Sequence, residues 1–300
     1  RITYISNNIS LIYGNTEEKM NNIKIICDSL TDIPTELIEK YDIDIVPLSV
    51  IFNDKEYVDG IDITKDEFYK MLRDNESLPK TSQVTYMSFK KVFEKYIKEN
   101  KSVLYIGGSS NLSGTYQSAV MAKNDIEGEI YTFDSLSASI GGACIVLSAA
   151  KLVKEDKDIN EILSHLEKLR NSISVFFTVD TLEYLQKGGR ISLAKATIGN
   201  MLSIKPVISL EDGLVKPLAQ ARGKKQVIGK IVDLIKENHS QDLTNKRIII
   251  GCGDNNQDLD LLKKKIMEEL KIGDLIFVNI GSCICAHTGP SVVGIACCDK

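Results

Sequence analysis

The chain has 300 residues, with 37 Lys and Arg against 41 Asp and Glu, which gives a formal charge of −4. At roughly 150 residues per domain, this length predicts two domains. A hydrophobic fraction of 43% beside 26% charged residues is typical of a soluble globular protein and excludes a mainly disordered one. Because the chain lacks the basic surplus of a polyanion binder, we expect no nucleic-acid partner.

The opening segment scatters Asn and Ser among its apolar residues, unlike the continuous apolar stretch of a signal peptide. No apolar run approaches the roughly 18 residues that a membrane-spanning helix needs. We therefore expect a cytoplasmic protein. Met20 lies just before the first predicted strand, so residues 1–22 are expected to be a leader or a loose arm outside the fold.

The seven cysteines sit mostly in apolar, strand-like runs, which predicts reduced and buried thiols. Cys283, Cys285 and His287, with the Cys-Cys pair at 297–298, would be the candidate ligands of a metal. Their spacing matches no standard zinc arrangement, and alternating cysteines on a strand share one face for packing reasons alone. We expect no metal and no cofactor.

The first half repeats a unit of strand, polar loop and helix. Strands are expected at 23–27, 102–106 and 129–133, and the helices that follow them at 34–41, 115–123 and 142–153, with two further helices at 65–73 and 88–98. Strands that alternate with helices predict a parallel sheet covered on both faces. Residues 23–170 are therefore expected to form an N-terminal parallel α/β domain.

The second half predicts a mixed sheet. Expected strands lie at 174–179, 204–210, 214–221 and 247–251, expected helices lie at 224–238 and 258–270, and two final strands flank the AHTGPS segment. A helix in TLEYLQKGGRIS is expected to stop at its Gly-Gly pair. The Glu-Asp-Gly turn joins two of the strands as a hairpin. Residues 171–300 are therefore expected to form a smaller α/β domain, so the fold class is two-domain α/β.

Four strand-to-helix loops of the first half are rich in hydroxyl side chains. Thr81 and Ser82 lie in one of them, and Ser110 and Ser113 lie in another. In a parallel sheet such loops meet at the carboxyl ends of the strands, where open α/β sheets bind ligands and helix N-termini favour an anion. The hydroxyl groups of these loops, with those of Thr81, Ser82, Ser110 and Ser113 among them, are therefore candidate donors to a carboxylate or phosphate. Helix capping is the alternative for each loop alone, since Ser and Thr are preferred caps.

Standard nucleotide and hydrolase motifs are missing, because there is no GxxxxGK[ST] loop, no GxGxxG after a strand and no GxSxG elbow. His287 is a candidate for a cleft between the two domains, and a backbone-bonded turn histidine is the alternative. Arg190 follows two glycines and would present a fork of donors to an acidic group, unless it is simply solvated after the helix. Arg222, at the end of a hairpin strand, is a weaker candidate.

An ordered series of segments is more specific than any one of them: DSLTDIP, VPLSV, KTSQVT, SSNLSGTYQSA, FDSLSAS, DTLEYLQKGGRIS, SIKPVISLEDG and HTGPSVVG. The series resembles the DegV family of bacterial fatty-acid-binding proteins, and the resemblance covers the chain after Met20. SSNLSGTYQSA and GGRIS carry most of its weight. It implies a parallel α/β domain packed against a smaller α/β domain, with one long-chain fatty acid buried in a tunnel between them.

The resemblance also implies roles for particular residues. Thr81 and Ser113 would bond the fatty-acid carboxylate, His287 would lie near it, and Arg190 and Arg222 would belong to the mouth where a separate kinase docks. One departure is visible in this region: the family commonly has Gly where this chain has Ser, at the end of HTGPS. If that Gly needs a positive φ, the turn after the histidine differs here.

By this resemblance the protein is a carrier that presents the acid to a fatty-acid kinase, which forms an acyl phosphate. The implied partners are the fatty acid, the kinase and, transiently, a membrane surface. Burying about 14 to 16 methylenes at roughly 0.8 kcal/mol each would offset the desolvation of one carboxylate. Two alternatives from other classes remain. One is an esterase or phosphotransferase with Ser113 as nucleophile, His287 as base and Asp134 as orienter, and the other is a sensor of some other carboxylate.

Overall fold

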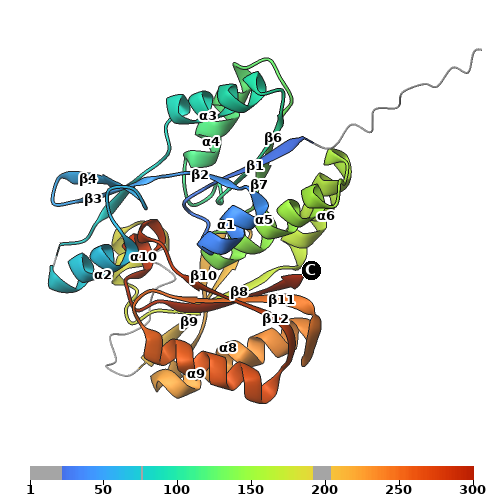
Figure 1. Cartoon of the computed structure of the whole chain (residues 1–300). Coiled ribbons are helices and arrows are strands. Elements are labelled where there is room, and N and C mark those ends of the chain that lie inside the picture. The colour runs from blue at the N-terminus through green and yellow to red at the C-terminus, as the bar shows by residue number, and fades with distance from the viewer. Residues whose placement is uncertain (1–21, 76, 192–203) are drawn as a thin grey trace, which may run out of the picture.

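The computed structural model describes residues 22–75, 77–191 and 204–300 (Figure 1). The predicted leader at 1–22 therefore lies almost wholly outside the described residues. The N-terminal part is built on a four-stranded parallel sheet in the order β2-β1-β6-β7. Its strands are β1 (Ile23–Asp28), β2 (Asp44–Val46), β6 (Ser102–Gly107) and β7 (Ile130–Asp134). The predicted parallel sheet is confirmed.

Helices cover both faces of this sheet. They are α1 (Thr35–Tyr41), α3 (Tyr86–Lys98), α4 (Thr115–Asn124), α5 (Ser139–Lys154) and α6 (Ile159–Ser172). Helices α3 and α4 pack together on one face, and α5 packs on the other. The run from Ile140 to Ala150 is buried without a break, because α5 is sandwiched between this sheet and strands β8, β11 and β13 of the second one. A helix that is apolar on every side suits such a position.

A small antiparallel sheet, β4-β3-β5, projects beside the parallel sheet and was not predicted. It consists of β3 (Ser49–Phe52), β4 (Lys55–Val58) and β5 (Lys80–Ser82), and α2 (Lys65–Asp74) lies between β4 and β5 in the chain. Helix α2 begins with a capping box, in which Thr64 and Glu67 satisfy each other's backbone N–H groups. The short strand β5 brings the KTSQ segment to the edge of this sheet.

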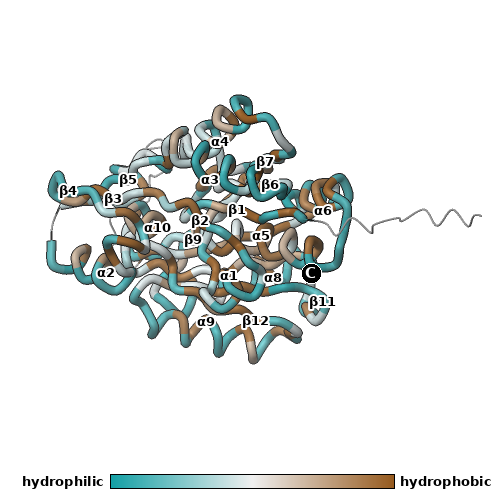
Figure 2. Tube along the Cα trace, turned by 45° about the horizontal axis from the view of Figure 1, so that its top comes forward, coloured by the Kyte–Doolittle hydropathy of each residue, from teal (hydrophilic) through white to brown (hydrophobic). Residues whose placement is uncertain are grey.

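The C-terminal part is a six-stranded mixed sheet in the order β10-β9-β8-β13-β11-β12. Its strands are β8 (Ser174–Thr178), β9 (Ile204–Glu211), β10 (Leu214–Arg222), β11 (Asp242–Cys252), β12 (Lys271–Asn279) and β13 (Val293–Asp299). Among the described strands of this sheet only β11 and β12 pair in parallel, so the predicted mixed sheet is confirmed. Helices α8 (Gly223–His239) and α9 (Asn256–Glu269) cover the face away from the parallel sheet (Figure 1). Figure 2 shows hydrophilic residues along the outer side of α9 and hydrophobic ones along β1 and α5.

Two short helices complete this half, α7 (Glu183–Lys187) and α10 (Ser282–Thr288). The expectation that Cys283 and Cys285 alternate on a strand is wrong, since both lie in α10. This helix packs against α2, β3 and β5 of the first half, which buries its cysteines. The residue with positive φ at its end is Gly289, at +78°. Ser291 needs no such φ, so the Ser in HTGPS does not strain the turn.

Candidate functional site

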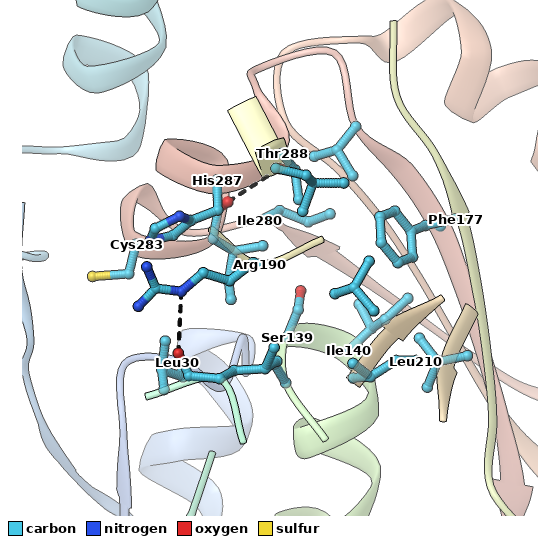
Figure 3. A pocket seen from close by; sticks show the side chains of 18 of the residues that line it. Leu30, Ser139, Ile140, Phe177, Arg190, Leu210, Ile280, Cys283, His287 and Thr288 are labelled. Carbon is cyan, nitrogen blue, oxygen red and sulfur yellow. Dashed lines mark hydrogen bonds between the residues drawn. The ribbon is translucent and has the colours of Figure 1, made fainter. Parts of the chain in front are cut away.

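One cavity lies between segments from both halves of the chain. It encloses about 810 Å³, its open mouth included, and its wall is mostly apolar. Residues 23–170 contribute Leu30, Thr81, Ser113 and Ile140, while residues 171–300 contribute Phe177, Arg190, Leu210 and His287. Figure 3 shows Arg190 and His287 at one end and Phe177 and Leu210 at the other. The cavity therefore has a polar end and an apolar end.

A hydrogen bond between Thr81 and His287 closes the polar end. Thr81 Oγ1 lies 2.8 Å from His287 Nε2, which joins the edge strand β5 to the last turn of α10. Burial, aided by the nearby guanidinium of Arg190, lowers the pKa of His287 to about 4. The imidazole is therefore neutral at pH 7. Its Nδ1 atom is buried and has no hydrogen-bond partner in the described structure.

Arg190 enters the cavity because of the two glycines before it. Gly189 adopts a φ of +70°, and the N–H of Arg190 then turns back to the carbonyl of Leu185 at 2.9 Å. The side chain donates from Nε to the carbonyl of Leu112 at 3.2 Å and from Nη1 to the carbonyl of Gly188. Burial lowers the pKa of Arg190, but a guanidinium stays charged at neutral pH.

Arg190 is the one charged side chain that lines the cavity among the described residues. No carboxylate within the described ranges forms an ion pair with it, and both of its hydrogen bonds go to neutral carbonyls. A half-buried cation without a countercharge costs free energy in an apolar site. The site is therefore electrostatically complementary to an anion with an apolar tail.

Ser113 lines the same cavity from the loop that follows β6. Its Oγ lies 2.9 Å from Thr115 Oγ1 and accepts from the Thr115 N–H at 3.2 Å. The serine is thus a cap on the first turn of α4 and a cavity residue at once. The capping role, which the sequence presents as the alternative to binding, therefore does not remove this residue from the cavity wall.

Comparison with known proteins agrees with this architecture. The family model described as "Uncharacterised protein, DegV family" matches residues 22–300. A DegV domain-containing protein of Caldanaerobacter subterraneus subsp. tengcongensis is 36% identical over 277 residues, which cover 92% of this chain and 98% of that protein. The chain belongs to the DegV family. The resemblance seen in the sequence is therefore confirmed.

Solved structures of similar proteins share the fold over almost the whole chain. A DegV lipid-binding protein from Thermotoga maritima is 32% identical with a TM-score of 0.86, over 93% of this chain and 98% of that one. A stearic acid-binding protein from Eubacterium ventriosum is 29% identical with a TM-score of 0.84, over 93% and 98% of the two chains. Both match the arrangement of a parallel sheet beside a mixed sheet.

Three of the predicted site residues do not line the cavity of this DegV chain. Ser82 lies in the β3–β5 ladder opposite Ser49, and the N–H of Ser110 donates to the carboxylate of Asp134 at 3.2 Å. Arg222 is exposed at the N-cap of α8. The structure thus brings together Thr81, Ser113, His287 and Arg190 but leaves the other three outside the cavity wall.

The alternative catalytic triad is not assembled. His287 bonds Thr81 and not Ser113, and the Asp134 carboxylate accepts from the N–H groups of Ser110 and Leu136 instead of orienting the imidazole. No hydrogen bond joins Ser113 to His287, or His287 to Asp134, in the described part of the chain. The serine therefore has no general base in this arrangement.

Several cavity residues were missed by the sequence analysis. Leu30 lies in a loop singled out for its hydroxyls, yet the leucine faces the cavity and Ser29 accepts from the N–H of Leu48. Ser139 and Thr288 also line the wall. Ser139 holds a φ of +51°, and its Oγ donates to Asp32 at 2.6 Å. The sequence did hold a signal for Leu30, because it is an apolar residue in a loop that directly follows a strand.

The described residues contain no group of three His, Cys, Asp or Glu side chains arranged to hold a metal. They also contain no helix long and apolar enough to cross a membrane. All seven cysteines are free and buried.

Proposed function

We propose that this protein binds one long-chain fatty acid, with the carboxylate at the polar end of the cavity and the acyl chain along the apolar wall. The observation that carries this proposal is the guanidinium of Arg190, which forms no ion pair with any described residue and lines a mostly apolar cavity whose other described residues are uncharged. The hydroxyl groups of Thr81 and Ser113 line the same cavity and could supply neutral donors. The lipid-binding and stearic acid-binding relatives support the same ligand class.

Neutral His287 suits a head-group site because it adds a polar contact without adding a charge. One guanidinium charge matches one carboxylate charge, and hydrogen bonds between charged groups are the strong ones. A fatty acid also satisfies the apolar end, where each buried methylene contributes about 0.8 kcal/mol. An alcohol or an ester of the same chain would fill the apolar end but leave Arg190 unpaired.

A second hollow on the protein surface reaches the same head-group residues from outside. Thr81, Arg190 and His287 line both the cavity and this hollow, which also includes Lys80 and Tyr184. We infer that a bound carboxylate is presented here to a separate fatty-acid kinase. The missing triad supports a carrier, since transfer to the carboxylate then needs groups from a partner.

The ligand is tested by measuring affinities for palmitic acid and for hexadecanol, which has the same chain. Wild-type protein should prefer the acid, and Arg190→Gln should weaken acid binding about 10- to 100-fold, the equivalent of losing a hydrogen bond to a charged group. Hexadecanol binding should stay unchanged in that variant. Arg222→Gln is the matched control, since this arginine lies outside the cavity. Equal affinities for acid and alcohol in the wild type would overturn the proposal.

The carrier role is tested by trapping acyl phosphate with hydroxylamine in the presence of ATP. The hydroxamate should form only when this protein, the fatty acid and a fatty-acid kinase are combined. Formation by this protein alone, or hydrolysis of a simple acyl ester that Ser113→Ala abolishes, would instead identify an enzyme.

A further inference from the structure

We propose that Phe177 and Leu210 form a stop at the apolar end of the cavity that sets the longest acyl chain bound tightly. The inference rests on the proposed function, because it takes the carboxylate to lie at Arg190. Figure 3 shows both side chains on the side of the cavity away from Arg190 and His287. Leu210 comes from β9 and Phe177 from its neighbour β8, so the stop is built on two adjacent strands.

The strand that carries Phe177 lies inside the sheet, with a paired neighbour on each side. Strand β8 is paired on both sides, with Phe177 opposite Ile208 of β9 and opposite Gly294 of β13. Successive side chains of a strand point to opposite faces. Phe176 accordingly joins the core under α8 and α9, while Phe177 faces the cavity. An acyl chain that reaches Phe177 therefore meets a hydrogen-bonded sheet with a packed core behind it.

A glycine stands beside Phe177 in the neighbouring strand β13. Gly294 lies beside it in the ladder and lines the same cavity. A Cβ atom placed on Gly294 would lie 2.9 Å from Phe177 Cβ and 3.3 Å from Ile140 Cδ1. The backbone of β13 therefore runs close to the base of the Phe177 side chain, and any side chain at position 294 would crowd both Phe177 and Ile140.

These contacts predict a break in the dependence of affinity on chain length. Before the stop, each additional methylene leaves water and should tighten binding about fourfold, the equivalent of about 0.8 kcal/mol. Beyond the stop, a further methylene must displace the Phe177 ring or pull the carboxylate away from Arg190. Affinity should then level off or fall with each added carbon.

The experiment measures dissociation constants for saturated acids from about 10 to 20 carbons, a range over which the fourfold steps are resolvable. Phe177→Ala should move the break to longer chains, and Leu210→Ala should do the same to a smaller extent. Leu210→Phe, which adds bulk at the same end, should move the break to shorter chains. Ile284→Ala is the matched control, because Ile284 lines the cavity from α10, the helix of His287, and should not lengthen the longest chain bound.

The outcomes separate this inference from the proposed function. If the wild type binds no acid of any length, the proposed function fails. If acids bind and Arg190→Gln weakens all lengths in parallel, but the break stays in place in the Leu210 and Phe177 variants, the stop is refuted and the head-group site stands. Should Phe177→Ala fail to fold by circular dichroism, the opposite shifts expected of the two Leu210 variants decide the matter.

Discussion

The neutral imidazole of His287 should make part of the folding stability depend on pH. In the unfolded chain a histidine titrates near pH 6.5, whereas burial and the charge of Arg190 lower the pKa of His287 to about 4 in the folded protein. Between these two pH values the unfolded chain binds a proton that the folded protein excludes. Stability from this group is therefore fully present above about pH 6.5 and is lost as the pH falls toward 4.

The size of the effect follows from the two pKa values. At pH 5 nearly all unfolded chains carry the proton on this histidine and few folded molecules do, which costs about 2 kcal/mol relative to pH 8. The hydrogen bond between His287 and Thr81 gives the neutral ring a partner within the fold. For a protein with a total stability of about 5 to 15 kcal/mol, this is a large share.

The contribution of His287 to the free energy of unfolding is measured by urea denaturation of the ligand-free protein and of the His287→Gln variant. Both are unfolded at pH 8, 7, 6 and 5, in roughly one-unit steps across the titration window. Glutamine keeps a polar side chain but does not titrate. The variant should lose about 2 kcal/mol less than the wild type between pH 8 and pH 5. Buried Asp28 and Asp32 also titrate abnormally, but they are present in both proteins and cancel in the difference. Parallel pH profiles for the two proteins would refute the reasoning.

Two further predictions concern the contacts that shape the cavity. Asp32 accepts from the Gly281 N–H at 2.7 Å and from Ser139 Oγ at 2.6 Å, so it joins the two halves of the chain while only 3% exposed. Asp32→Ala should cost about 3 kcal/mol in denaturant unfolding, because it leaves the buried Gly281 N–H and the half-buried Ser139 hydroxyl without this partner. A loss below about 1 kcal/mol would contradict this account. Gly188 lies against His287 Nδ1, and a Cβ there would overlap that atom and approach the Tyr184 carbonyl at 2.8 Å, so Gly188→Ala should displace the imidazole and weaken fatty-acid binding several-fold. Gly189→Ala is the comparison, because nothing lies near its Cβ position while its φ is +70°, and it should mainly lower stability. Equal effects of the two variants on affinity would argue against a steric role for Gly188.

The position of Arg190 changes how the resemblance is interpreted. By the family pattern this residue belongs to the mouth where a partner docks, and the structure shows that it lines both the cavity and the outer hollow. A guanidinium at this junction is able to pair with a bound carboxylate and to face a protein that approaches from outside. Arg222 lies exposed at the start of α8 and shares neither of these positions.

The order of strands and helices could be predicted from the sequence because it depends on local patterns. Alternating apolar strands and amphipathic helices indicated the parallel sheet, and the Glu-Asp-Gly turn indicated the β9–β10 hairpin, where Leu214 does pair with Glu211. The continuous apolar run in α5 was visible too. The helix lies between two sheets, and only their packing explains why it has no polar face.

Which side chains meet in the cavity was decided by contacts between segments far apart in the chain. Thr81 and Ser82 are neighbours on β5 and must point to opposite faces, and only the docking of α10 on that strand selects Thr81. The CICAH segment has a strand-like composition but forms a helix packed against the first half. Local composition thus determined the elements and the hydroxyl-rich loops. Tertiary packing decided which loop residues face the cavity, since side-chain direction depends on the partner each backbone segment packs against.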